Sequence, residues 1–182
     1  MAEQLIKNRG DFRNLITYKK SDIIFQITHF FCSHFLKPGD RTIDQMIQAA
    51  RSGKQNIAEG AAAAATSAKT EIRLTSVAKA SLQELLEDYM DFLKINNCEQ
   101  WQPGSREFEY MRNLGRTNND AAFYMSLIEV RPPATIANMC IILLKQTDYL
   151  LHRQIESLAK KFLEEGGFSE RMFRLRKDRR GF

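Results

Sequence analysis

Apolar residues recur at helical spacing along most of this chain, and one seam constrains the fold most strongly. Its members are separated by four, three, four and three residues, which is the heptad spacing of a helix that packs along a partner helix. They are Ala78, Leu82, Leu85, Tyr89 and Phe92. A polar N-cap at Thr66 or Ser67 and the end of the pattern at Asn96 predict a helix over 67–96. A rod of that length, roughly 43 Å at 1.5 Å per residue, needs partners of similar length.

Three further long helices are predicted from the same kind of pattern. They span residues 14–36, 41–62 and 133–165. Asp40 suits the N-cap of the second, Pro133 suits the first turn of the last, and Gly166 suits its end. The first helix is apolar around much of its circumference, which indicates either deep burial or contact with a second subunit.

Residues 97–131 form an insertion before the last long helix. Ser105 is the N-cap of one short helical pattern, and Asn119 or Asp120 is the N-cap of another. The run 123–130 has a strand-like composition, but a lone strand without a partner is not expected. The sequence therefore predicts an all-α fold, an up-down-up-down four-helix bundle with a helical insertion and a basic C-terminal tail. The bundle covers residues 1–168, and the tail covers residues 169–182.

Composition narrows the class of protein further. The longest strictly apolar run is six residues, from Met139 to Leu144, far short of the roughly 20 that a membrane-spanning helix needs. The first residues lack the apolar core of a signal peptide. The three cysteines are widely spaced and odd in number, which favours buried, reduced thiols over a disulfide framework. We expect a cytoplasmic protein with no membrane partner.

Positive charge gathers at the C-terminus. The chain carries a net charge of +5, yet residues 1–168 hold 21 basic and 20 acidic side chains and are nearly neutral. The tail holds six basic side chains and two acidic ones. The basic residues are Arg171, Arg174, Arg176, Lys177, Arg179 and Arg180. Three interpretations stay open for the tail: binding of nucleic-acid phosphates, docking of its apolar side on a neighbouring subunit, or a solubilising end. Lys54, Lys69 and Arg73 are further candidates for nucleic-acid contact.

No constellation in the sequence indicates catalysis. The histidines His29, His34 and His152 lack the spacing of metal ligands, and no Glu-x-x-His pair is present. The Gly53-Lys54 pair lacks the remaining residues of a phosphate-binding loop. Carboxylates on the 67–96 helix are interpreted as a solvated face or as partners for cations of another subunit, rather than as acid–base groups. We therefore expect no enzyme, no metal and no cofactor.

Two sequence words resemble those of a known family. Residues 52–60 read Ser-Gly-Lys-Gln-Asn-Ile-Ala-Glu-Gly, and residues 78–85 read Ala-Lys-Ala-Ser-Leu-Gln-Glu-Leu. With the opening at 12–20, they resemble the four-helix-bundle family of ribosomal-RNA intervening-sequence proteins, which includes the accessory protein of diversity-generating retroelements. The resemblance implies an up-down-up-down bundle, often in a homopentameric ring, and a partnership with nucleic acid and a reverse transcriptase. The chain differs in its Gly53-Lys54 pair, its longer insertion and its C-terminal suffix, which is found in a subset of such bundles.

Several positions within these words have a physical interpretation of their own. Small residues such as Gly60 let a second helix approach closely. Asn56 and Glu59 lie three residues apart on one helix face, where an amide and a carboxylate can bond to groups of the 67–96 helix. The predicted structural motif consists of Asn56, Glu59, Gly60, Ser81 and Glu84. Packing and capping are the favoured roles, and a ligand role is the alternative. The functional hypothesis is a non-enzymatic oligomeric scaffold that binds RNA, DNA or a nucleic-acid enzyme. Its alternative is a protein–protein assembly module with no nucleic-acid role.

Overall fold

The computed structural model describes residues 11–180, and within them every regular element is a helix. This confirms the predicted all-α class. The elements are the short 3-10 helix η1 (Phe12–Asn14) and the helices α1 (Ile16–Phe35), α2 (Arg41–Ala63), α3 (Ala68–Ile95), α4 (Arg106–Thr117), α5 (Ala121–Ile128), α6 (Pro133–Glu165) and α7 (Phe168–Arg180). The four longest helices begin and end within two residues of the predicted bounds. None of the helices in residues 11–180 combines the length and apolarity needed to cross a bilayer.

Polar N-caps explain where several helices begin. The side chains of Asp40, Ser67, Ser105 and Asp120 each accept a hydrogen bond from a backbone N–H in the first turn of the helix that follows. Each of them satisfies an amide that has no partner inside the helix. At the other end of α6, Gly166 has a φ of +74°, a left-handed conformation that few side chains tolerate.

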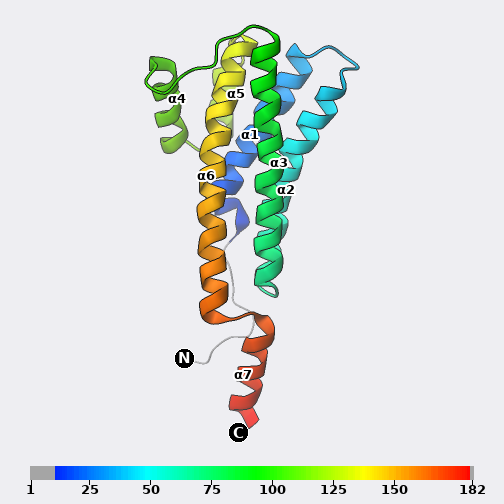
Figure 1. The fold of residues 1–182 in the computed structure, drawn as a ribbon, viewed down its shortest axis with the longest axis vertical. Helices are drawn as coiled ribbons and strands as arrows, with labels where there is room; N and C mark the ends of the chain where they lie inside the picture. Colours follow the sequence, from blue (N-terminus) through cyan, green and yellow to red (C-terminus); the bar gives the residue numbers. More distant parts are fainter. Residues whose placement is uncertain (1–10, 181–182) are drawn as a thin grey trace.

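The four long helices α1, α2, α3 and α6 enclose the core. Each contacts two of the others, α1 with α2 and α6, and α3 with α2 and α6, so that the contacts close into a ring (Figure 1). Four of the five seam residues are buried, and Phe92 is half-buried. The Tyr89 hydroxyl donates to Thr28 Oγ1 at 3.0 Å, which pairs a buried phenol of α3 with α1. The phenol is therefore satisfied inside an otherwise apolar core.

The 52–60 segment is where α2 meets α3 closely. A Cβ atom built on Gly53 would lie 2.5 Å from Leu82 Cδ2, so α3 occupies the space that a larger residue would need. Ser52 Oγ and Ser81 Oγ are 2.9 Å apart and form a hydrogen bond between the two helices. The expectation that Asn56 bonds to this neighbouring helix is wrong, because its amide donates to Ser52 O at 2.9 Å and to Ser52 Oγ at 3.1 Å. The amide reaches only one turn back along α2, and Ser52 carries the connection to α3.

The insertion forms two helices and no strand, and it lies at the upper end of the molecule in Figure 1. α4 packs on α6, and α5 packs on α1. The segment before α4 is held by Asn138, a buried residue of α6: Trp101 N–H donates to Asn138 Oδ1 at 2.8 Å, and Asn138 Nδ2 donates to Glu99 O at 3.0 Å. Trp101 is half-buried and packs against the core, so it covers the end of the helices.

The cysteines are free thiols, as expected from their spacing. Cys32 and Cys140 are buried, and burial raises the pKa of each thiol to about 12. Cys98 is half-buried near the end of α3. The two buried thiols therefore behave as small apolar side chains rather than as nucleophiles.

Candidate nucleic-acid interface

The basic tail is a helix. Helix α7 continues beyond the ends of α3 and α6 at the lower end of the molecule (Figure 1). Its exposed basic side chains are those of Arg174, Arg176, Lys177 and Arg179, whereas Arg171 is half-buried. Arg180 is the last residue of the helix, and its side chain lies outside the described part of the chain, as do residues 181–182.

Helix α7 is attached to the end of α6 by specific contacts. Glu170 Oε2 accepts from Gly167 N–H at 2.9 Å in the first turn, where a carboxylate suits the helix dipole. Arg174 Nη2 donates to Glu165 O at 3.0 Å, so a cation meets the carbonyl end of α6. Phe168 and Met172 are half-buried, but Phe173 is 70% exposed. The first turn of the helix therefore lies against the end of α6, and the rest of the helix extends beyond the four long helices with its cations and an aromatic ring exposed (Figure 1).

The beginning of α3 lies at the same end of the molecule. Residues 64–68 of the connection between α2 and α3, the last turns of α6 and the first turn of α7 line one small hollow. Lys69 and Arg73, in the first two turns of α3, are both exposed. The predicted cations that gather here form what we call the basic end: Lys69, Arg73, Arg171, Arg174, Arg176, Lys177 and Arg179. The structure thus brings together two parts of the chain about 100 residues apart.

Lys54 does not belong to this group. It lies nine residues before the end of α2, where its Nζ atom is 3.1 Å from Asp22 Oδ1 and 4.2 Å from the centroid of the Phe25 ring. Its side chain is 19% exposed. An ammonium group paired with a carboxylate and covering an aromatic ring joins α1 to α2, which is a packing role.

The remaining motif residues lie along the sides of the helices. Gly60 is buried against α3, where a Cβ atom would meet Glu71 O and Leu74 Cβ at 3.4 Å, whereas Glu59 and Glu84 are exposed. The pKa of Asp88 is raised by partial burial and then by the negative charges of Asp91 and Glu84. Like charges this close oppose ionisation. This acidic side of α3 fits the predicted solvated face.

The described residues contain no metal-binding cluster. Within residues 11–180, no three His, Cys, Asp or Glu side chains are grouped closely enough to hold an ion. His29, His34 and His152 are all exposed. His152 Nε2 lies 3.3 Å from Glu156 Oε1, one turn further along α6, which is a surface contact.

The comparisons with known proteins give no family. No family model, no curated protein and no solved structure matches this chain. The resemblance carried by residues 52–60 and 78–85 therefore stays a prediction. What the protein does has to be argued from the placement of its charges and cavities.

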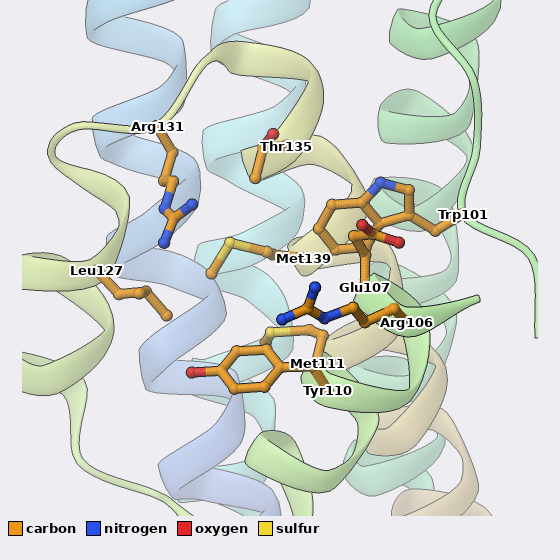
Figure 2. A pocket seen from close by; sticks show the side chains of 9 residues that line it. All are labelled: Trp101, Arg106, Glu107, Tyr110, Met111, Leu127, Arg131, Thr135 and Met139. Atoms are coloured by element: carbon orange, nitrogen blue, oxygen red, sulfur yellow. The ribbon is translucent and has the colours of Figure 1, made fainter. Parts of the chain in front are cut away.

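A pocket of about 280 Å³ at the opposite end from α7 is not predicted by the sequence. Figure 2 shows the guanidinium groups of Arg106 and Arg131 on two sides of Met139, with Trp101 and Tyr110 near Arg106. The lining thus holds two guanidinium groups and two aromatic rings, together with one carboxylate, that of Glu107. The lining residues come from α4, α5, α6 and the segment before α4, so no short motif indicates the pocket. Trp101 is the one sequence signal for it.

Proposed function

We propose that the protein is a non-enzymatic oligomeric scaffold that binds nucleic acid through its basic end. The observation that carries the proposal is the placement of α7 at the same end of the molecule as the first turns of α3, where Lys69 and Arg73 are also exposed (Figure 1). Arginine and lysine side chains at such an end attract phosphates and release counterions when they bind. A disordered tail would have to lose conformational freedom on binding, whereas a helix anchored to α6 is already ordered.

The aromatic ring on α7 adds a second kind of contact. Phe173 is 70% exposed and lies between Met172 and Arg174 in sequence. An exposed ring beside arginines is the arrangement on which unpaired bases stack, and stacking tolerates any base. We therefore propose single-stranded RNA or DNA as the preferred form, bound with little sequence preference.

The proposed architecture is an up-down-up-down four-helix bundle with α4 and α5 as its insertion. The closed ring of contacts among α1, α2, α3 and α6 supports it, as do the short connections 36–40 and 64–67. We also propose that the chain belongs with the intervening-sequence and retroelement accessory proteins. The support is the 52–60 segment, which packs α2 on α3 through Gly53 and the Ser52–Ser81 hydrogen bond.

One observation favours the alternative of an assembly module. Leu163 and Phe173 are 83% and 70% exposed at this same end of the molecule. Large apolar side chains left in water are characteristic of surfaces that a second subunit covers. In this alternative, the apolar side chains of the end make the contact and the arginines stay in water.

Fluorescence anisotropy with single-stranded RNA and DNA at two salt concentrations tests the proposal. Truncation after Gly167 should weaken binding and reduce the slope of log K against log salt, by about 0.7 for each phosphate that the tail would otherwise neutralise on a single strand. The double variant Lys69→Ala/Arg73→Ala should reduce the slope by a smaller amount. Lys94→Ala, at the opposite end of α3, is the matched control and should change neither quantity.

The same variants distinguish the two functions. If the truncated protein binds both nucleic acids with the affinity and salt slope of the full chain, the basic end is not the interface. If truncation instead lowers the mass measured in solution and nucleic-acid binding is absent in both forms, the assembly module is correct.

A further inference from the structure

Lys20 of α1 is a buried cation without a carboxylate partner. The residue is 3% exposed, and its ammonium group donates to the backbone carbonyl of Gly115 in α4. Within residues 11–180 this neutral oxygen is the only hydrogen-bond partner of a group that carries three donors. Burial lowers the pKa of Lys20 to about 8. Burying this charge costs desolvation free energy, and no described side chain offsets that cost with an opposite charge.

Two other lysines that connect two helices each have a carboxylate partner. Lys54 of α2 lies 3.1 Å from an Asp22 carboxylate oxygen, and Lys79 of α3 lies 2.8 Å from one of Asp148. Both side chains are more exposed than Lys20. A lysine that served only to join α1 to α4 would be expected to have a carboxylate in the same way. Its absence among the described residues indicates that an anion from outside completes the site.

Lys20 and Gly115, whose carbonyl accepts from the ammonium group, both line a groove of about 480 Å³ between α1, α4 and α6. The groove is within the size range of small-molecule sites. Its lining residues are Ile16, Lys20, Phe108, Arg112, Gly115, Arg116, Ile142, Lys145, Gln146, Tyr149 and Leu150. None of these described lining residues is acidic, and four are cationic. Arg112 also pairs with Glu109, at 3.4 Å, which leaves Lys20, Arg116 and Lys145 as the lining cations with no ion pair to a described carboxylate, beside apolar walls.

One more polar group in the groove lacks a partner. The Gln146 side chain donates from Nε2 to Arg112 O at 2.8 Å, which leaves its Oε1 atom buried and without a hydrogen bond. A Cβ atom built on Gly115 would overlap this oxygen. Only a glycine at this position therefore leaves room for the Gln146 amide. A buried acceptor next to a buried donor is a place for a polar head group and its water.

We propose that this groove binds a small amphipathic anion, a medium-chain carboxylate, with its head group at Lys20 and its apolar body along Ile142 and Leu150. Charge complementarity selects the anionic head, because every charged side chain among the described lining residues is positive. The apolar walls select the body, which would be removed from water. The groove lies beside α4, away from α7, so this site is separate from the proposed nucleic-acid interface (Figure 1).

Isothermal titration of the full chain with decanoate tests the proposal, with decanol as the neutral ligand of equal length. Decanoate should bind saturably and at least tenfold more tightly than decanol. Lys20→Met keeps an unbranched side chain that is one atom shorter and removes its charge, and it should weaken decanoate binding at least tenfold while leaving decanol unaffected. Lys19→Met is the matched control: Lys19 is exposed on the adjacent position, and its replacement should change affinity less than twofold.

A measurement on the unmodified protein does not depend on how the variants fold. The affinity for decanoate should fall as pH rises from 7 to 10, because Lys20 loses its proton, by up to tenfold for each pH unit above the pKa of Lys20 in the free protein, and it should level off above the higher pKa of Lys20 in the complex. The other charged or titratable side chains that line the groove with Lys20 are those of Arg112 and Arg116 of α4 and of Lys145 and Tyr149 of α6. Tyr149→Phe and Lys145→Met should therefore preserve the pH dependence.

Three outcomes would overturn the proposal. The first is an equal effect of Lys20→Met and Lys19→Met on decanoate affinity, and the second is decanol binding as tight as that of decanoate. The third is absence of saturable decanoate binding together with a fall in solution mass when Tyr149, which is 63% exposed, is changed to arginine. That combination would show that a second copy of the chain covers the groove.

Discussion

Two buried glycines of α2 should respond in opposite ways to the same substitution. Gly53 and Gly60 are both buried and both face α3. A Cβ atom at Gly53 would lie 2.5 Å from Leu82 Cδ2 and 2.6 Å from Leu82 Cγ, whereas at Gly60 the nearest atoms are at 3.4 Å. Leu82 is 2% exposed and cannot move without displacing other core side chains. Alanine is therefore too large at the first position and fits at the second.

The magnitudes follow from two opposing effects. Alanine stabilises a helix interior by about 0.8–1 kcal/mol relative to glycine. Overpacking a core costs about 1–3 kcal/mol. Gly60→Ala gains the first without the second and should stabilise the protein by about 1 kcal/mol. Gly53→Ala has both effects. Overpacking outweighs the gain in helix propensity, so this substitution should destabilise the protein by about 1 kcal/mol. At about 2–4 °C for each kcal/mol in a chain of this size, the two melting temperatures should differ by about 4–8 °C.

Thermal and urea unfolding monitored by circular dichroism measure both changes. The Leu82→Ala background provides a control, because it removes the atoms that a Cβ at Gly53 would meet, and there Gly53→Ala should become stabilising. If Gly53→Ala raises the melting temperature as much as Gly60→Ala does in the unmodified protein, the close approach of α2 and α3 at Leu82 is wrong.

Two further predictions concern the thiols and the insertion. At pH 8 Ellman's reagent should label Cys98 in the folded protein, but Cys32 and Cys140 only after unfolding. Burial leaves almost none of the Cys32 and Cys140 thiols ionised at that pH. Rapid labelling of all three cysteines would contradict the burial of Cys32 and Cys140. Asn138→Ala leaves the N–H of Trp101 and a second backbone group without their partner. It should cost about 2 kcal/mol in urea unfolding and shift the tryptophan emission to longer wavelength, whereas an unchanged spectrum would show that Asn138 does not hold this segment.

The helices can be predicted because their signals are local. Caps such as Asp40 and Ser105 bond to the first turn of the helix that follows them. The spacing of apolar residues along α3 indicates which side of that helix is buried. The same holds for residues 123–130, where the local cap at Asp120 begins the predicted helix although the composition is strand-like. The helical state of α7 does not follow from its sequence, because charged, amphipathic ends are compatible with several states.

The partners of individual side chains cannot be predicted in this way, because they depend on which helices become neighbours. The charge of Lys54 predicts contact with phosphate, but its partner Asp22 lies 32 residues away on α1. The spacing of Asn56 predicts contact with α3, and a neighbouring serine makes that contact instead. The groove at Lys20 is the extreme case, since its carbonyl partner in Gly115 is 95 residues away in sequence.

The position of the basic end follows from the order of the helices. α2 ends where α3 begins, so Lys69 and Arg73 lie beside the connection 64–67. α6 returns to that same end after the insertion, which lies at the other end, and α7 continues from it (Figure 1). The charges of α3 and α7 therefore add in one region although each segment alone is modestly basic. If several copies assembled with these ends on one side, the potential would be multiplied without any new basic residue, and the salt dependence of binding would steepen with the number of copies.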